Sequence, residues 1–272
     1  MKRSIFVVLL CFWVGFGQAQ SNIHFGGRSA GLAHASVTLS DVWSSHHNQA
    51  GLAWIKKPSI GVYYQNKFSI KELDNIGLAY VHPIKKGALA LQWSNFGYAL
   101  YQENKIGLAY ALQLSDKLTG AVQIDYLNTK LGGIYGSKTA LTGEVGLQAK
   151  VSSKIRMGVH VYNPTRSKLN DYNDEAIPTI MRFGMDYRFS EKVLVVAETE
   201  KDIDHVAMLK TGVEYNASSK FVFRAGVSTG PTLGSFGFGL NMEQYRLDIA
   251  TSYHQTLGFS PELSFVYQFK KG

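Results

Sequence analysis

The sequence is poor in cysteine, proline and long hydrophobic runs: its 272 residues include one Cys and six Pro. The only cysteine, Cys11, lies in a leader that we expect to be removed. The mature chain therefore has no thiol for a disulfide bond, for nucleophilic catalysis or for a metal site. The basic residues are scattered in runs no longer than two, which argues against a nucleic-acid-binding protein, because such proteins carry a basic patch or stripe.

Residues 1–19 have the features of a secretory signal peptide. Lys2 and Arg3 form its charged start, Ile5–Gly15 its apolar core, and Gly17-Gln18-Ala19 a small-residue cleavage site. The apolar core is too short to cross a bilayer as a helix, which needs about 20 apolar residues. The sequence therefore predicts an exported protein whose mature chain begins at Gln20.

From residue 58 onward, apolar and polar residues alternate with a period of two. In one segment, for example, Met181, Phe183 and Met185 alternate with Arg182 and Gly184. A strand with one apolar face has this pattern, and helical spacing is absent from this part of the chain. Most of the segments reach the ~9–11 residues that a tilted strand needs to cross a bilayer. We predict fourteen of them, at residues 58–68, 74–83, 87–97, 102–114, 118–129, 138–151, 155–163, 178–189, 193–201, 205–217, 221–229, 233–242, 245–254 and 261–269.

The connections between these segments alternate in length. Short ones, such as 115–117 and 152–154, alternate with mostly longer ones, such as 130–137 and 164–178. Short turns on one rim and longer loops on the other are typical of outer-membrane barrels. Composition alone also allows a soluble, secreted all-β protein, but the loop pattern favours the membrane. We therefore predict an all-β fold: an antiparallel transmembrane β-barrel of about 14 strands over residues 58–272, in the outer membrane of a Gram-negative bacterium.

The last predicted strand supports this prediction. Its apolar residues Leu263, Phe265, Tyr267 and Phe269 alternate with polar ones. This strand resembles the C-terminal signal that the barrel-assembly machinery reads, with residues 270–272 added after the final aromatic residue.

The side of each strand that faces away from lipid differs around the barrel. Predicted strands two to five carry mostly Gly and Ala there, whereas strands eight to thirteen carry charges, which need partners when they are buried. We expect residues 20–57 to fold into the lumen as a short helical plug, or hatch, against the small residues, with Arg28 joining a paired charge network. An alternative is that Gly and Ala only relieve crowding in a narrow barrel. The predicted network consists of Arg182, Asp186, Arg188, Lys210, Glu214, Arg224, Arg246 and Asp248.

The stretch Gly26–Ala53 is rich in Gly, Ala and Ser, and Asp41 can cap a short helix over Val42–His47. It resembles the start of the FadL-like outer-membrane barrels, and more closely that of the PorV/PorQ proteins of type IX secretion. Those families begin with a Gly/Ala-rich run containing an Arg and carry an Asn-Pro-Ala-Gly-Leu motif after a short helix. Gln49 stands here where the motif has Pro. The matching residues are Gly27, Arg28, Ala30, Gly31, Ala35, Asn48, Gln49, Ala50, Gly51 and Leu52.

The resemblance implies two functions. The first, which we take as the main hypothesis, is a non-enzymatic accessory subunit of a protein secretion system that binds another outer-membrane protein. The second is a FadL-like channel for hydrophobic small molecules, with a plug that moves and a lateral opening in the wall. A purely structural barrel is the third hypothesis. In each case we expect contact with outer-membrane lipid and lipopolysaccharide, and no nucleic acid or cofactor.

Four sets of residues are candidates for a catalytic or metal site. The segment around Ser29 fits G-x-S-x-G, but the strand and helix that a nucleophile elbow needs are absent. His46 and His47 are adjacent and would diverge on a helix, and the acidic stretches 170–175 and 202–204 lack the spacing of an EF-hand. His160, His205 and His254 define no triad by their spacing. We therefore predict no catalytic, cofactor-binding or metal-ligating residues and no enzyme.

Overall fold

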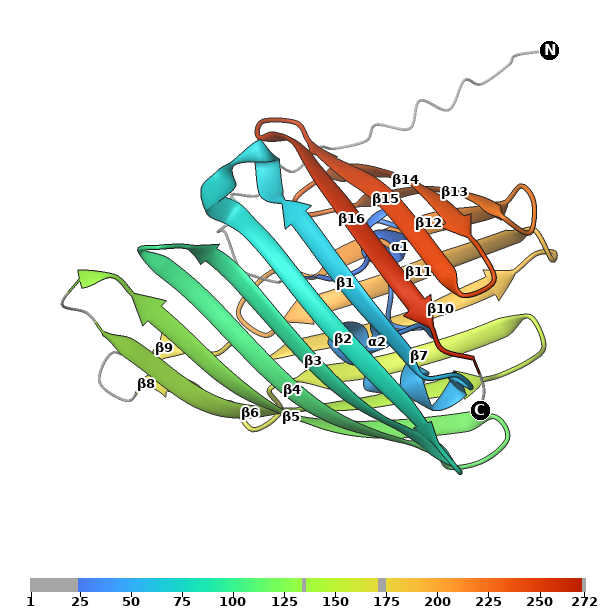
Figure 1. Cartoon of the computed structure of the whole chain (residues 1–272), viewed down its shortest axis with the longest axis horizontal. Coiled ribbons are helices and arrows are strands. Elements are labelled where there is room, and N and C mark those ends of the chain that lie inside the picture. Colours follow the sequence, from blue (N-terminus) through green and yellow to red (C-terminus); the bar gives the residue numbers. More distant parts are fainter. Residues whose placement is uncertain (1–23, 134–135, 171–174, 271–272) are drawn as a thin grey trace, which may run out of the picture.

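The computed structural model describes residues 24–133, 136–170 and 175–270, and the predicted signal peptide lies outside these residues. Fourteen strands close into one antiparallel barrel, with β1 paired to both β2 and β16 (Figure 1). The strands are β1 (Ser59–Asn66), β2 (Asp74–Ile84), β3 (Gly87–Tyr98), β4 (Tyr101–Gln113), β5 (Leu118–Leu131), β6 (Ser137–Lys150), β7 (Ile155–Tyr162), β10 (Ile180–Arg188), β11 (Val193–Asp202), β12 (Met208–Asn216), β13 (Phe221–Ser228), β14 (Leu233–Asn241), β15 (Tyr245–His254) and β16 (Gly258–Gln268).

Each predicted segment corresponds to one barrel strand, which confirms the predicted fold class. The largest differences are at strand starts. β12 begins at Met208 because the preceding residues form a turn, closed by a hydrogen bond from the His205 N–H to the Asp202 carbonyl. β16 begins at Gly258, since it pairs with β15 as far as His254. A small sheet of β8 (Lys168–Asn170) and β9 (Glu175–Ala176) in the longest loop was not predicted.

The short helices lie before and just after β1. They are α1 (Gly27–Ala30), α2 (Ser44–His47) and the 3-10 helices η1 (Gln49–Trp54), η2 (Lys67–Ser69) and η3 (Lys71–Leu73). In the described part of the chain, none is long and apolar enough to span a membrane.

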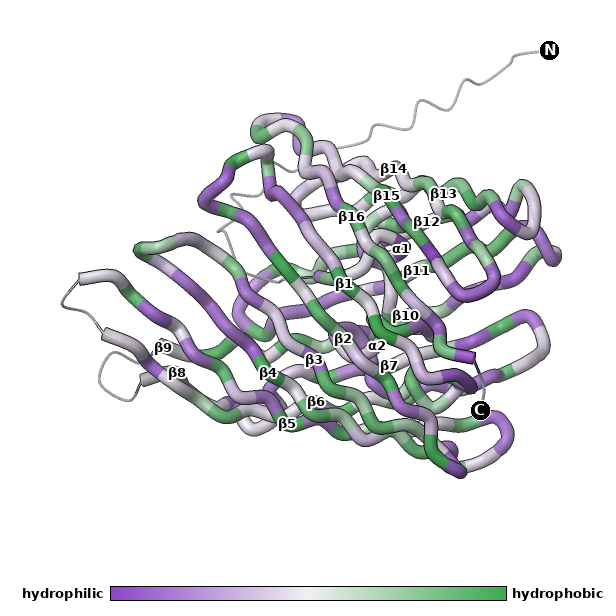
Figure 2. The backbone as a smooth tube through the Cα atoms, viewed as in Figure 1, coloured by the Kyte–Doolittle hydropathy of each residue, from purple (hydrophilic) through white to green (hydrophobic). Residues whose placement is uncertain are grey.

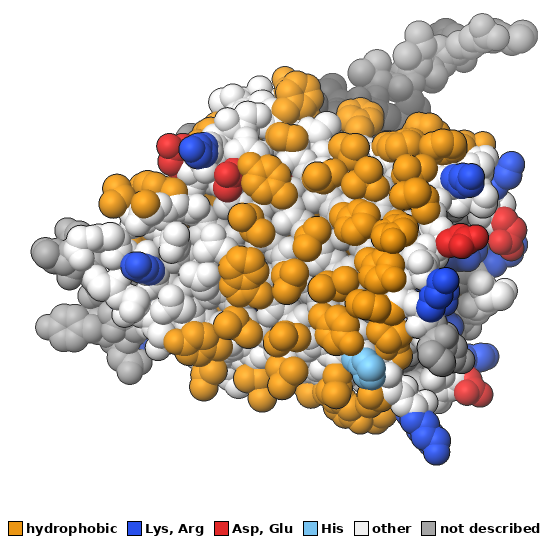
Figure 3. Space-filling view, viewed as in Figure 1, with side chains coloured by type: hydrophobic (Ala, Val, Ile, Leu, Met, Phe, Trp, Pro, Cys, Tyr) orange, Lys and Arg blue, Asp and Glu red, His pale blue; other side chains and the backbone are white. Residues whose placement is uncertain are grey.

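The outer surface of the barrel carries the apolar residues of the alternating pattern. On β4, the side chain of Leu108 is 60% exposed, whereas that of the neighbouring Ala109 is 1% exposed. Apolar side chains cover the middle of the wall in Figure 3, and green and purple positions alternate along the strands in Figure 2. An apolar band around a closed barrel is the surface that an outer-membrane protein presents to lipid. The fold is that of an outer-membrane β-barrel, and its short hairpins all lie on one rim, which in such barrels is the periplasmic one.

Arginine at an outward position should destabilise the barrel in its membrane. We expect Leu108→Arg to lower the free energy of unfolding by roughly 2–4 kcal/mol, because the charge would enter the hydrocarbon region. Gln113→Arg, on the lumen face near the periplasmic end of the same strand, should have little effect. Denaturant unfolding in lipid vesicles measures both; equal losses would contradict the assignment of faces.

Candidate functional site: the lumen and the N-terminal segment

Residues 24–57 are called the N-terminal segment below; they lie inside the barrel, with α1 and α2 between its walls (Figure 1), except for Lys56 and Lys57, which are exposed at the rim. Phe25, Val42 and Trp43 are each at most 3% exposed and form an apolar cluster with Tyr63 of β1. Burial of these rings holds the segment in the lumen, since apolar surface removed from water contributes about 25 cal/mol per Å².

The 3-10 helix η1 packs against the wall that is lined with small residues. Its Ala50, Leu52 and Ala53 are fully or almost fully buried. Alanine leaves room beside a strand, so the helix backbone can approach the wall closely. The wall residues in this cluster are Ala79, Ala88, Ala90, Ala109, Ala111 and Ala121.

Glycine permits close approach of the segment to other strands of the wall. A Cβ atom at Gly158 of β7 would lie 2.5 Å from the Val37 carbonyl oxygen, and one at Gly212 of β12 would lie 2.9 Å from Leu32. Any side chain at these two positions would displace the N-terminal segment.

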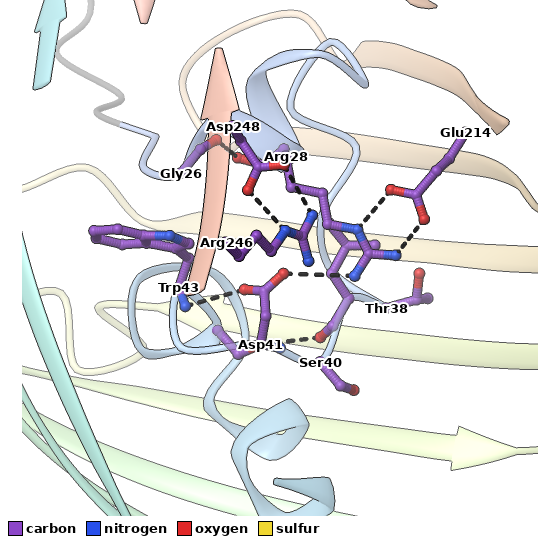
Figure 4. A network of polar contacts seen from close by, with 12 residues as sticks. Gly26, Arg28, Thr38, Ser40, Asp41, Trp43, Glu214, Arg246 and Asp248 are labelled. Carbon is purple, nitrogen blue, oxygen red and sulfur yellow. Dashed lines mark hydrogen bonds and ion pairs between the residues drawn. The ribbon is translucent and has the colours of Figure 1, made fainter. Parts of the chain in front are cut away.

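The first charge network joins the segment to β12 (Figure 4). Arg28 of α1 binds Glu214 in a bidentate fork: its Nε donates to Oε2 at 2.8 Å and its Nη2 to Oε1 at 2.7 Å. Arg28 also lies 3.5 Å from the carboxylate of Asp41, within the segment itself. Bidentate guanidinium–carboxylate pairs are among the stronger and most directional polar contacts in proteins.

The same network continues around the wall. Arg224 of β13 donates to Glu214 at 2.7 Å and to Asp248 of β15 at 2.8 Å, and Arg246 donates to Asp248 at 3.1 Å. Three guanidinium groups thus face three carboxylates. Burial opposes the charge of Arg28, but the attraction of Glu214 and Asp41 outweighs it and raises the pKa of Arg28 above its ordinary value. Arg28 is therefore a permanent cation, matched by fixed acidic partners.

A second network surrounds Glu198 and Glu200 on β11. The Glu198 carboxylate accepts the backbone N–H groups of Ser36 and Val37 at 2.7 and 2.8 Å. Glu200 accepts from Lys210 at 2.7 Å and from Arg182 at 2.8 Å. The turn between α1 and α2 is therefore hydrogen-bonded directly to the wall through Glu198, and neither Glu198 nor Glu200 was in the predicted network.

A third network lies on β4–β7, and two of these strands, β4 and β5, belong to the wall that we predicted to carry mainly small residues. Lys105 contacts both Glu144 and Asp125, and the Glu144 carboxylate also binds His160 at 2.7 Å. Gln49 of the segment donates to the same carboxylate at 2.7 Å. The inward direction of these four side chains follows from their positions in the alternating pattern, but their convergence from four strands depends on the register of the barrel.

The motif residues of the N-terminal segment serve as contacts to the wall. The Asn48 amide donates to the carbonyls of Val37, Leu147 and Val159, and its side-chain oxygen accepts the Ala50 N–H. Gln49 supplies an amide donor to Glu144 that a proline at this position would lack. The remaining motif positions are buried: the Gly27 N–H donates to Ser264 at 3.0 Å, Gly31 packs on Gly237, and Gly51 packs on the Leu39 carbonyl.

Two sequence-based assignments need correction. Arg188 is exposed at the periplasmic end of β10, so its guanidinium lies outside the buried network, whereas Asp186 on the same strand is buried. Helix α2 begins at Ser44 rather than Val42, because Asp41 closes the preceding turn: its carboxylate accepts the Trp43 N–H at 3.0 Å.

Ser29 and Asp202, candidates for catalytic and metal sites, have other contacts. The Ser29 hydroxyl donates to the carbonyls of Phe25 and Gly26, and Asp202 accepts from His205 within its own turn. Among the described residues, no group of three or more His, Cys, Asp or Glu side chains could hold a metal ion. Burial lowers the pKa of both His46 and His47 well below the ordinary value, so these imidazoles are neutral at physiological pH.

A cavity lies on each side of the segment. The outer cavity, about 300 Å³, opens toward the longer loops and has both apolar walls (Phe25, Tyr101, Leu127 and Ile177) and polar ones, including Lys105 and Glu144. The inner cavity, about 350 Å³, lies toward the periplasmic rim and is lined by Trp43, Trp54, Ile55 and Arg246, among others. The N-terminal segment lines both cavities, so it lies between them.

No protein-family model matches this chain, and no curated protein matches its sequence. Solved structures do. The CymD monoaromatic hydrocarbon channel is 14% identical, with a TM-score of 0.70, over 93% of this chain and 100% of its own. The Ralstonia pickettii toluene transporter TbuX is 13% identical, with a TM-score of 0.73, over 91% and 99%. A Pseudomonas aeruginosa FadL homologue is 13% identical, with a TM-score of 0.61, over 90% and 97%. These likenesses establish that this chain shares the barrel fold of those structures.

Proposed function

We propose that this barrel is an uptake channel for small hydrophobic molecules and that the N-terminal segment is its plug. The observation that carries the proposal is the pair of cavities on either side of the segment, the outer one walled in part by aromatic and aliphatic side chains. A cavity of about 150 Å³ can hold benzene, so the outer cavity is roughly large enough for a substituted aromatic ring.

The comparisons support this proposal over the secretion role that the sequence favoured. Similar structures are described as channels or transporters for toluene and monoaromatic hydrocarbons, and these descriptions agree with the chemistry of the outer cavity. The secretion role stays a prediction, because it depends on contacts with another protein. No catalytic role is proposed.

Blocking the outer cavity tests the proposed function. Thr129→Trp would place a large ring in this cavity, and we expect it to reduce toluene uptake roughly tenfold, since such sites enclose most of a ligand's surface. The measurement is uptake of radiolabelled toluene by cells with an intact lipopolysaccharide layer that express the protein. Ile124→Trp is the matched control, because it lies on the same strand but its side chain is 66% exposed on the lipid face. Wild-type uptake no faster than that of cells without the protein would overturn the proposal.

A further inference from the structure

The periplasmic rim repeats one hairpin four times. Each copy has the pattern Ser-x-Lys, and in each the serine hydroxyl accepts the N–H groups two and three residues later, at 3.1–3.3 Å. This contact closes the turn, so the serine accounts for the local backbone. The copies are Ser115-Asp116-Lys117, Ser152-Ser153-Lys154, Ser190-Glu191-Lys192 and Ser218-Ser219-Lys220.

The lysines occupy equivalent positions in the barrel. Each lysine comes just before the second strand of its hairpin, and its carbonyl accepts the N–H of the last residue of the strand that pairs with that second strand. Lys117 accepts in this way from Lys150 at 2.7 Å, and Lys154 from Arg188 at 2.8 Å. Lys86, in the β2–β3 hairpin, makes the same bond with Gln113 at 2.8 Å. Five of the six short hairpins thus place a lysine at one level of the rim, and the sixth places Gln244 there.

These five side chains have no structural partner among the described residues. All five are exposed, and none forms an ion pair within the part of the chain that the structure describes. The turn bond uses the backbone carbonyl, which any residue could supply. A repeated cation that the fold does not need indicates a ligand outside the chain.

The surrounding rim is basic and lies at the edge of the membrane. Exposed aromatic residues lie just on the membrane side of the hairpins, including Phe189, Phe221 and Tyr245. Aromatic rings at this level mark the headgroup region. Charged side chains gather at this end of the barrel in Figure 3. The exposed basic residues are Lys56, Lys57, Lys85, Lys86, Lys117, Lys154, Arg188, Lys192, Lys220 and Lys270, against the acidic Asp116, Glu191 and Glu243.

We propose that Lys86, Lys117, Lys154, Lys192 and Lys220, here called the lysine collar, bind anionic phospholipid headgroups of the periplasmic leaflet. The collar follows most of the circumference, as the surrounding lipid does, whereas a protein partner would contact one sector. A lysine ammonium on a flexible stem can reach diffuse phosphate groups while its methylenes stay against the apolar wall. Basic residues next to a membrane attract anionic lipid in this way.

Lipid retention tests the collar. The mature protein is reconstituted in vesicles of four parts phosphatidylethanolamine to one part phosphatidylglycerol, and its bound lipids are counted by native mass spectrometry. We expect phosphatidylglycerol to be enriched several-fold over its bulk share. Substitution of all five lysines by glutamine should return the bound lipid to the bulk ratio, because the attraction is electrostatic.

Substitution of the same five lysines by arginine is the matched control, and it should keep the enrichment because it keeps the charge. Each variant is checked for folding on a gel, where a closed barrel migrates faster without boiling than after boiling. Wild-type protein that retains both lipids in their bulk ratio would overturn the proposal, as would a glutamine variant with undiminished enrichment. If the glutamine variant instead loses a periplasmic protein that co-purifies from native membranes, with no change in lipid, the collar binds protein and the lipid assignment is wrong.

Discussion

Deletion of Gly26–Ala53 is expected to turn a closed protein into a conducting one. The barrel closes through the pairing of β1 with β16, which the deletion leaves intact. Fourteen strands enclose more space than the side chains of an eight-stranded barrel can fill, so removal of the segment should join the two cavities into a water-filled path. Single-channel conductance in planar bilayers measures the difference between the full-length and deleted proteins.

The deletion should also weaken the barrel, since Glu214, Glu198 and Glu144 each lose donors from the segment. Each lost hydrogen bond to a charged group is worth roughly 1.5–3 kcal/mol. Slower migration after boiling serves as the control for assembly. Equal conductance in the two proteins would mean that the segment does not block the lumen in the membrane, and it would favour a partner-binding role for these residues.

The largest effect of a single substitution is expected at Glu214. This carboxylate binds Arg28 and Arg224 together, so Glu214→Gln leaves the half-buried guanidinium of Arg28 and the buried guanidinium of Arg224 short of a countercharge. Removing one member of a buried ion pair costs roughly 3–5 kcal/mol, because the remaining charge is uncompensated. The measurement is the free energy of unfolding in lipid vesicles, with tryptophan fluorescence as the probe; Trp43 and Trp54 of the segment report on the lumen.

Two further variants isolate the cause. Glu191→Gln removes a carboxylate from the exposed periplasmic rim and should change stability by about 0.5 kcal/mol or less. The double variant Arg28→Met with Glu214→Gln removes both members of the fork and should lose less than the sum of the single losses, since the two residues are in contact. Strict additivity would show that the fork between Arg28 and Glu214 contributes nothing to stability.

The strands were predictable because a membrane barrel imposes a rule on every residue. Each outward side chain faces lipid and each inward one faces the lumen, so the period of two runs through every barrel strand and can be recognised without knowing which strands pair. The short turns could also be predicted from the sequence, as the Ser-x-Lys hairpins show. The small sheet β8–β9 was missed, since its strands have three and two residues and no alternation can be seen at that length.

The contacts in the lumen could not be predicted from the sequence. The alternating pattern of a strand shows that a charged residue faces the lumen. Its partner, however, depends on the stagger between strands and on where the N-terminal segment lies. Arg28 and Glu214 are 186 residues apart, and Lys105 and Glu144 are 39 apart, yet each pair is in direct contact. Arg188 occupies an inward position of β10, as the network residues do on their strands. It is nevertheless exposed, because it lies at the periplasmic end of the strand, and position along the strand also decides burial.

By itself, the sequence determined the barrel, the number of its strands and the positions of its short hairpins, because these follow from local periodicity and turn chemistry. Only the tertiary structure decided which charges pair, how the segment divides the lumen into two cavities, and that the lysines of separate hairpins share one level of the rim. Those features arise when distant segments meet, and their geometry is set by the register of the closed sheet.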